Sequence, residues 1–292
     1  MKKPILCAGR LYCDLVFTDV PRLPTLGTEV FAPGLSLHAG GGAFISGATL
    51  AALGHPVTQF SILPAEPFDA VVLADLAAHG VSADACHAVD GVDAQITIAI
   101  GSAKDRAFLT RADGPALPDL SAIDFHDFAH LHVGELRTLQ DNPALLDRAK
   151  AAGLTISLDC GWQDDFAPDL ADLIAAVDVF LPNEAEAAAL AALGIPEACA
   201  ALTVIKSGEH GARARLRSDV DWTQISASPV PVLDATGAGD AFNGGFLSQW
   251  LDNRPLARCI TQGNACGAAA VQALGGAGAL KEFAGGAGVV AT

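Results

Sequence analysis

Short runs rich in valine, isoleucine and leucine alternate with alanine- and leucine-rich stretches of helical period along most of this chain. That alternation is typical of parallel strands joined by crossover helices, and it predicts an α/β fold with a mostly parallel sheet flanked by helices (α/β/α). The predicted strands span residues 4–9, 57–62, 129–133, 154–159, 178–181 and 202–206. The predicted helices span about 43–53, 68–79, 143–152, 184–193, 240–251 and 256–273.

Two segments interrupt this alternation, at about residues 12–36 and 93–112. Both contain β-type stretches without a helix between them, so we expect them to pair as a small sheet outside the main one. Such a sheet would form a lid over a site at one edge. We therefore expect one domain over residues 1–292 with the lid inserted in it, and a loop over the glycine-rich tail from residue 275.

The chain has 292 residues, with 17 Lys and Arg against 33 Asp and Glu, a formal net charge of −16. Because nucleic acids and anionic membranes are bound through clustered basic side chains, this balance argues against both as partners. Hydrophobic residues make up 51% of the chain, yet no apolar run approaches the roughly 20 residues of a membrane helix. The start of the sequence has only a short strand-like apolar stretch rather than the core of a signal peptide, so we expect a cytoplasmic protein. The seven cysteines include no C-x-x-C pair, so we expect buried free thiols.

The most informative motif is the glycine-rich stretch Asp-Ala-Thr-Gly-Ala-Gly-Asp-Ala-Phe at residues 234–242. It follows an extended segment and precedes a helical pattern, so its backbone N–H groups would point outward at the positive end of a helix dipole. This arrangement predicts an anion-binding site. Asp240 would lie at the same helix terminus, where a carboxylate can accept the proton of a hydroxyl beside the bound anion.

This stretch resembles the second signature of the ribokinase-like (PfkB-type) carbohydrate kinases. The resemblance implies the ribokinase-like fold and a phosphotransferase with ATP and Mg²⁺ as cofactors. It also implies that the backbone of Gly237, Ala238 and Gly239 forms an anion hole for the transferring phosphoryl group, and that Asp240 is the catalytic base.

A second signature of the family, a glycine pair followed by a helix that ends in Leu-Gly, is matched at residues 40–54. The resemblance places Gly40 and Gly41 at the sugar, and the family usually has Asn where Ile45 stands. Asp14, just beyond the first predicted strand, matches the family's substrate-binding aspartate. Glu135 falls where relatives often carry a polar residue near the active site.

The nucleotide end of the site is also implied by the resemblance. Asn183 and Glu186 match the family's Asn-x-x-Glu element, which organises Mg²⁺ and phosphate largely through water. The segment Lys206, Ser207 and Gly208 resembles the strand and turn beside the nucleotide phosphates, which Lys206 could reach as a point charge.

Three further positions follow from the same comparison. Asn264 falls on the helix that lines the adenine pocket in relatives. Asp234 and Thr236 occupy positions near a monovalent cation site, for K⁺, that many members have.

Other nucleotide and metal motifs are absent. The residues before Lys206-Ser207 lack the glycine of a Walker site, and Phe242 stands where a dinucleotide fingerprint needs its third glycine. His126, His130 and His132 have no accompanying carboxylate, so we interpret them as structural rather than as a zinc site.

We therefore expect an ATP-dependent kinase acting on a primary hydroxyl of a sugar or sugar-like molecule. A sugar acid, a hexose, a pentose and a nucleoside all remain open as acceptors, and so does a non-catalytic sugar- or nucleoside-binding protein of this fold. The apolar residues of the lid, such as Phe17, Phe31 and Ile98, also predict a homodimer joined through it.

Overall fold

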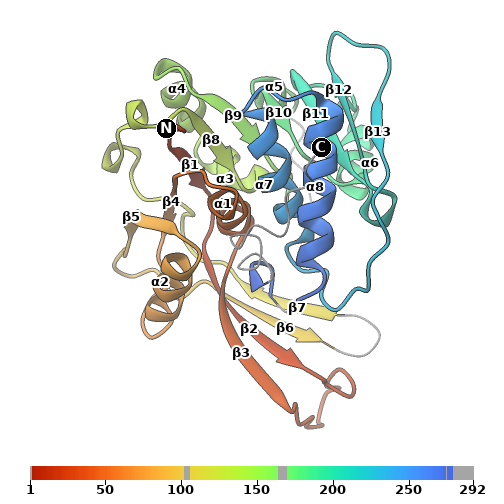
Figure 1. Cartoon of the computed structure of the whole chain (residues 1–292). Coiled ribbons are helices and arrows are strands. Elements are labelled where there is room, and N and C mark those ends of the chain that lie inside the picture. Colours follow the sequence, from red (N-terminus) through yellow and green to blue (C-terminus); the bar gives the residue numbers. More distant parts are fainter. Residues whose placement is uncertain (1, 102–105, 164–169, 274, 279–292) are drawn as a thin grey trace.

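The computed structural model describes residues 2–101, 106–163, 170–273 and 275–278. It has a nine-stranded sheet in the order β13-β12-β11-β10-β9-β8-β1-β4-β5, flanked by helices (Figure 1). All pairs from β11 to β5 are parallel, and β12 and β13 are antiparallel to their neighbours. The predicted α/β/α fold is confirmed, while the expected loop at the C-terminus lies, beyond residue 278, outside the described residues.

The strands of the large sheet match the six predicted ones to within two residues and add three at its edges. They are β1 (Ile5–Ala8), β4 (Val57–Ile62), β5 (Val81–His87), β8 (His130–Val133), β9 (Thr155–Leu158), β10 (Val179–Phe180), β11 (Leu202–Lys206), β12 (Ala212–Leu216) and β13 (Thr223–Ile225). The three that the pattern did not predict, β5, β12 and β13, are edge or near-edge strands. Their mixed polar sequences have no continuous apolar run to identify them.

Alternate residues of the strands pack into two separate cores, as expected for a sheet covered on both faces. Ile5 and Cys7 of β1 join the core under α1, α2, α7 and α8, whereas Leu6 and Ala8 join the core under α3, α4, α5 and α6. The helices are α1 (Gly42–Ala52), α2 (Asp69–Ala78), α3 (Leu136–Asp141), α4 (Ala144–Ala151), α5 (Leu170–Ala175), α6 (Glu184–Ala192), α7 (Ala238–Trp250) and α8 (Leu256–Ala270), with 3₁₀ turns at Leu120–Ala122, Phe125–Asp127 and Gly208–His210.

A separate four-stranded sheet, here called the lid, stands apart from the large one (Figure 1, bottom). Its order is β3-β2-β6-β7, from β2 (Tyr12–Thr18), β3 (Gly34–Gly40), β6 (Ile96–Gly101) and β7 (Arg106–Arg111). β3 was not predicted as a strand, and it runs to Gly40, beyond the expected limit at residue 36. The lid therefore leads directly into the glycine run before α1.

The strand order reverses direction between β1 and β8, since the chain proceeds from β1 to β4 on one side and later returns to β8 on the other. Ligands in open α/β sheets bind at such a switch point, beyond the carboxyl ends of the strands. Here those ends carry Gly9 after β1 and Gly134 after β8, and a Cβ at Gly134 would overlap the backbone N of Ala43. The two glycines thus let α1 approach the sheet edge closely.

No helix in the described ranges is long and apolar enough to cross a membrane. All seven cysteines are free thiols, as expected, and most of them are buried.

Candidate active site

The N-termini of α1 and α7 meet at the switch point, and each begins in a glycine-rich turn. The Asp240 carboxylate in the first turn of α7 lies against Gly42 at the start of α1: a Cβ at Gly42 would be 2.7 Å from Asp240 Oδ1. Ser46 of α1 fixes the same turn, since its hydroxyl donates to the Asp240 carbonyl at 3.0 Å. Asp240 is therefore placed by close backbone contact between two helices.

The protonation of Asp240 is set by its surroundings. Burial raises the pKa of its carboxyl to about 8, with a further contribution from the nearby charge of Asp159. The Lys206 ammonium acts in the opposite direction. An Asp of this kind titrates near neutral pH, as a general base should.

The turn before Asp240 depends on a glycine and on its cover. Gly237 has a φ of 69°, in the left-handed region, and a Cβ there would lie 2.7 Å from Gly276 Cα and 2.8 Å from Ile45 Cδ1. Asp234 connects the turn to residues 275–278, because its carboxylate accepts from the N–H of Thr236 at 2.7 Å and from the N–H of Gly275 at 3.0 Å. Residues 275–278 therefore cover the turn.

Ile45 does not have the exposed position expected of a sugar-binding residue. It is only 4% exposed and fills the space beneath Gly237 and Gly276. The replacement of Asn by Ile at this position therefore supports the glycine-rich turn by packing, in addition to removing an amide that could bind a sugar.

Asp14 faces the same glycine run from the lid. It lies on β2 opposite Thr97 of β6, and its carboxylate packs so closely on Gly40 that a Cβ there would overlap it. Burial raises the pKa of Asp14 to about 7, although a hydrogen bond from Thr97 opposes the shift. Because Gly40 and Gly42 can be at most roughly 7 Å apart, the Asp14 and Asp240 carboxylates lie on neighbouring parts of one short segment.

Glu135 and Arg10 lie at the ends of β8 and β1. Glu135 Oε1 accepts from the Arg10 backbone N–H at 3.3 Å and from the Thr138 hydroxyl at 2.7 Å. The buried Arg10 guanidinium donates to Gln95 Oε1 at 2.8 Å and to the carbonyls of residues 113 and 114 at 3.1 and 2.9 Å. Arg10 thus connects the end of β1 to the segments beside the lid strands β6 and β7, and these protein groups accept its hydrogen bonds.

Lys206, expected at the nucleotide phosphates, is held by two other side chains. Its Nζ donates to both carboxylate oxygens of Asp159, at 2.9 and 3.0 Å, and to Asn243 Oδ1 at 3.1 Å. Burial alone would lower the pKa of Lys206, but the three nearby carboxylates of Asp159, Glu186 and Asp240 raise it. The ammonium therefore stays charged beside Asp240, and its contact with phosphate stays a prediction.

Asn183 and Glu186 form a capping box at the start of α6. Asn183 Oδ1 accepts from the Glu186 N–H at 2.9 Å, and Glu186 Oε2 accepts from the Asn183 N–H at 2.8 Å. Burial, followed by the charge of Asp159, raises the pKa of the Glu186 carboxyl. The structure thus brings Glu186 into the group around Lys206.

The remaining nucleotide-end residues lie on the surface side of this group. The Ser207 hydroxyl donates to Glu184 Oε1 at 2.8 Å, and Gly208 begins an exposed 3₁₀ turn. Asn264 of α8 donates to the Ile225 carbonyl at 3.1 Å and so fastens α8 to β13.

The side chains near Lys206 suit a metal ion that is bound mainly by water and phosphate oxygens rather than by the protein. No three His, Cys, Asp or Glu side chains of the described residues are grouped so that they alone could hold a metal. Asp159, Glu186 and Asp240 nevertheless face one ammonium, that of Lys206. This excess of negative charge fits Mg²⁺, which keeps most of its waters and needs few protein oxygens.

Asp159, Asn243 and Arg10 were missed by sequence reasoning. Asp159 is the last residue of the strand predicted at 154–159, a position at the carboxyl end of the sheet that could have identified it, and Asn243 lies one helical turn after Asp240. Arg10 gave no such signal, because its partners are more than eighty positions away.

His130 and His132 are buried against hydroxyl groups of the neighbouring strand β9. His130 contacts the hydroxyls of Thr155 and Ser157 at 2.8 Å each, and His132 contacts Ser157 at 2.9 Å. Burial lowers the pKa of His130 to about 3 and that of His132 to about 4.

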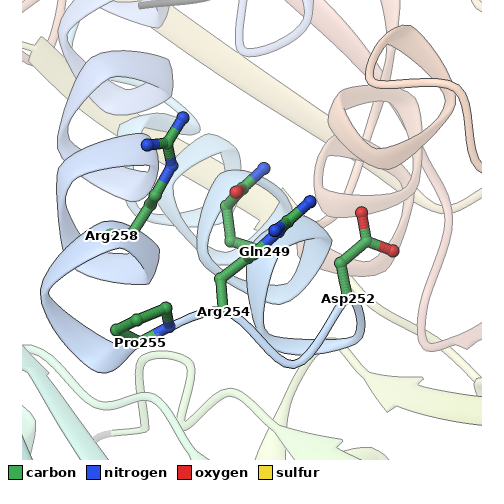
Figure 2. A pocket seen from close by; sticks show the side chains of 5 residues that line it. All are labelled: Gln249, Asp252, Arg254, Pro255 and Arg258. Carbon is green, nitrogen blue, oxygen red and sulfur yellow. The ribbon is translucent and has the colours of Figure 1, made fainter. Parts of the chain in front are cut away.

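A surface pocket of about 520 Å³ lies between the end of α7 and the start of α8, at the other end of α7 from Asp240 (Figure 2). Its lining residues are Gln249, Asp252, Arg254, Pro255 and Arg258. Asp240 is nine positions before Gln249 on the same helix, roughly 14 Å along its axis. The pocket is therefore separate from the candidate active site.

Comparisons with known proteins identify the family of this chain. The family model of the pfkB family carbohydrate kinases matches residues 3–282. An ATP-dependent ribose-1-phosphate kinase of Halopiger xanaduensis is 28% identical over 275 residues, covering 90% of each chain. A cytidine kinase of Thermococcus kodakarensis is 30% identical over 130 residues, which are 41% of this chain and 47% of that one.

The fold is also that of solved kinases. The Arabidopsis thaliana ribokinase complexed with ribose and ATP superimposes with a TM-score of 0.80 at 19% identity, covering 97% of this chain and 99% of that one. Together with the match over nearly the whole sequence, this places the chain in the pfkB family of carbohydrate kinases.

Proposed function

We propose that this protein transfers the γ-phosphoryl group of ATP to a primary hydroxyl of a sugar or sugar-like molecule, and that residues 1–292 act as a single kinase domain. The observation that carries the proposal is the pair of carboxylates on one glycine run. Asp14 packs on Gly40 from the lid, and Asp240 packs on Gly42 from the N-terminus of α7. A polyol between them would have one carboxylate to hold it and another to deprotonate it.

In this mechanism Asp240 accepts the proton of the attacking hydroxyl. The backbone N–H groups of Gly237, Ala238 and Gly239, at the positive end of α7, stabilise the charge on the transferring phosphoryl group. Asp14 accepts hydrogen bonds from other hydroxyls of the acceptor, and charge-assisted bonds of this kind are the stronger ones. We assign Gly40, Gly41 and Glu135 to the same acceptor site, because Gly40 lies against Asp14, while Gly41 and Glu135 both lie against the backbone of Arg10.

We propose that the nucleotide lies along the edge formed by Asn183, Lys206, Ser207 and Gly208, with Asn264 near the base. Mg²⁺, held through water by Glu186, would neutralise charge on the phosphates when bound. Asp234 and Thr236 would accompany a monovalent cation such as K⁺ beside the covered turn, where the Asp234 carboxylate already binds two backbone N–H groups.

The acceptor that best suits these side chains is uncharged. Asp14 and Glu135 are acidic, and the cations near them are engaged: Arg10 by Gln95 and two carbonyls, and Lys206 by Asp159. A phosphate or carboxylate on the acceptor would meet acidic groups without a free basic partner among these residues. We therefore propose a neutral sugar or nucleoside rather than a sugar acid or sugar phosphate.

We also propose a homodimer formed through the lid. Cross-strand register places Leu37, Leu15, Ile98 and Leu109 side by side on one face of the lid, opposite to the face of Asp14. Leu35, Phe17 and Ile100 extend the same row. Here this row is called the apolar lid face; Leu35 is 53% and Leu109 67% exposed, which is unusual for a surface without a partner.

A coupled assay of ADP release over neutral sugars and nucleosides tests the proposed activity. The Asp240→Asn variant keeps the shape of the side chain and removes the base, so kcat should fall ~10²–10⁴-fold while ATP binding is retained. Asp141→Asn, an exposed change in α3, is the control and should retain full activity. An Asp240→Asn variant with more than about a tenth of the wild-type kcat would contradict the role of the base.

A further inference from the structure

Asp159, Lys206 and Asn243 form a closed triangle of hydrogen bonds behind the glycine-rich turn. Besides the bonds from Lys206 to the other two, the Asn243 amide donates to Asp159 Oδ2 at 2.6 Å. The ammonium has three protons, and Asp159 and Asn243 offer it three oxygens at 2.9–3.1 Å. The position of this ammonium is therefore fixed from two directions.

That position is directly beside the anion hole. A Cβ at Gly239 would lie 3.4 Å from Lys206 Nζ and 3.8 Å from Lys206 Cε. Gly239 precedes Asp240, and Asn243 lies one turn later on α7. The triangle thus links the carboxyl ends of β9 and β11 to the first turn of the helix that carries the base.

The charges around the triangle explain why the ammonium needs a fixed place. Asp159 follows β9, Glu186 lies on α6 and Asp240 on α7, so three carboxylates compete for Lys206. His132 on β8 and Cys160 next to Asp159 are further titratable groups facing the triangle; burial lowers the pKa of His132 and raises the pKa of the Cys160 thiol, so both stay neutral. Without Asp159 and Asn243, the flexible lysine side chain would be free to pair with Glu186 or Asp240 instead.

We propose that Asp159 and Asn243 are positioning residues that hold the Lys206 ammonium beneath Gly239, where its charge supports the transferring phosphoryl group and the ionised Asp240. This inference rests on the kinase activity proposed above. A charge fixed before the reaction costs no reorganisation when the phosphoryl group moves, which is why preorganised charges are effective in catalysis.

The test compares Asp159→Asn and Asn243→Ala with the control Asp178→Asn. Asp178 lies at the opposite end of the sheet from Asp159: it precedes β10, and its carboxylate accepts from the Ile156 N–H at 2.7 Å. We expect kcat to fall ~10²–10³-fold in Asp159→Asn, as for other losses of preorganised charge, and less in Asn243→Ala. KM for ATP and for the sugar should change much less than kcat, and Asp178→Asn should remain close to wild type.

A pH profile separates positioning from a general loss of structure. Removing the negative charge of Asp159 should move the acidic limb of the kcat profile to lower pH, because that charge raises the pKa of Asp240. Lys206→Met should move the limb to higher pH, and the double variant Lys206→Met with Asp159→Asn, which removes both partners of the Lys206–Asp159 ion pair together, should fold and remain slow.

Three results would overturn the inference. They are a kcat for Asp159→Asn close to that of the wild type, an equal loss of kcat in Asp178→Asn, or a shift of the acidic limb of the kcat profile in the same direction for Asp159→Asn and Lys206→Met. If wild-type protein released no ADP with any acceptor, the proposed function would fail as well. Activity in the wild type with an unaffected Asp159→Asn variant would remove the positioning role alone.

Discussion

Asp14 and Asp240 are both partly buried residues with raised carboxyl pKa values, but they differ in what surrounds them. Asp240 lies among Asp159, Glu186 and Lys206, so its charge is balanced in part by a fixed ammonium. Asp14 has a hydrogen bond from Thr97 and the distant charge of Asp234, with no cation among the causes of its shift. Because no cation offsets its charge, ionisation of Asp14 should change the free energy of unfolding more directly than ionisation of Asp240 does.

The first prediction is that protein stability depends on the titration of Asp14. Its folded-state pKa of about 7 is above its ordinary value of 3.8, so the stabilising contribution of the protonated form is complete below pH 3.8 and is lost as pH rises through 7. The Tm of the wild type should therefore fall between pH 4 and pH 8 more than the Tm of Asp14→Asn, as thermal unfolding at several pH values would show. Parallel curves for the two proteins would mean that Asp14 titrates normally.

The second prediction concerns the role of Asp14 in binding. Asp14→Asn should raise KM for the sugar about 10-fold or more, since hydrogen bonds to a charged acceptor contribute about 1.5–3 kcal/mol, and should leave KM for ATP nearly unchanged. Steady-state kinetics with each substrate varied in turn would measure both values. Equal increases in the two KM values would indicate a structural role for Asp14.

At the residue scale, the glycine-rich turn before a helix pointed to Asp240, whereas Lys206 and Glu186 were assigned through the resemblance to the family. The structure brings these three side chains together. The direction of the Lys206 side chain was not predictable, because it depends on Asp159, which is 47 positions away. Ile45 shows the same limit: its packing depends on Gly276 in the tail.

At the scale of elements, the glycine-rich turn that begins α7 is packed against residues 275–278, which cover it. Gly237 needs its left-handed backbone, and it also needs the absence of a Cβ, since Gly276 and Ile45 occupy that space. Gly54 at the end of α1 has a similar φ of 82°, but no atom lies within 4 Å of a Cβ there. A substitution at Gly54 would therefore strain only the backbone, whereas a substitution at Gly237 would strain the backbone and also clash with neighbouring atoms.

The third prediction uses this pair of glycines. Gly237→Ala and Gly54→Ala should both lose about 1–2 kcal/mol of stability from the left-handed backbone, but only Gly237→Ala should also push the tail from the turn and lower kcat at least 10-fold. Unfolding in urea and steady-state kinetics would measure the two effects. A Gly54→Ala variant as inactive as Gly237→Ala would show that stability, rather than the covered turn, limits activity.

At the same scale, the order of the main strands and helices followed from alternating apolar runs, and the lid followed from its two β-type segments. The missed strand β12, with its alternating Ala and Arg, is held by antiparallel pairing with β11 rather than by a buried apolar run. No local pattern could reveal that pairing.

On the scale of the whole molecule, the charge of the site should decide the acceptor. The fourth prediction is that ribose is phosphorylated with a kcat/KM at least 10-fold above that of ribose 1-phosphate, because Arg10 and Lys206 are engaged and a net charge of −16 repels anions. The comparison should be made at two salt concentrations, since screening would reduce the difference. A preference for the phosphorylated sugar would show that a basic side chain becomes free in the complex.

The final prediction is that the apolar lid face joins two copies of the chain. Buried between two lids, Leu109 and its neighbours would each contribute roughly the 1.5–3 kcal/mol of a buried aliphatic side chain, whereas a single lid leaves them in water. Sedimentation at micromolar concentration should give twice the chain mass of 29.7 kDa for the wild type and a monomer for Leu109→Asp. Val220→Asp, at an 85% exposed position in the turn between β12 and β13, is the matched control and should stay dimeric. A wild-type protein of 29.7 kDa would rule out the dimer, and a dimeric Leu109→Asp variant would move the interface to another surface.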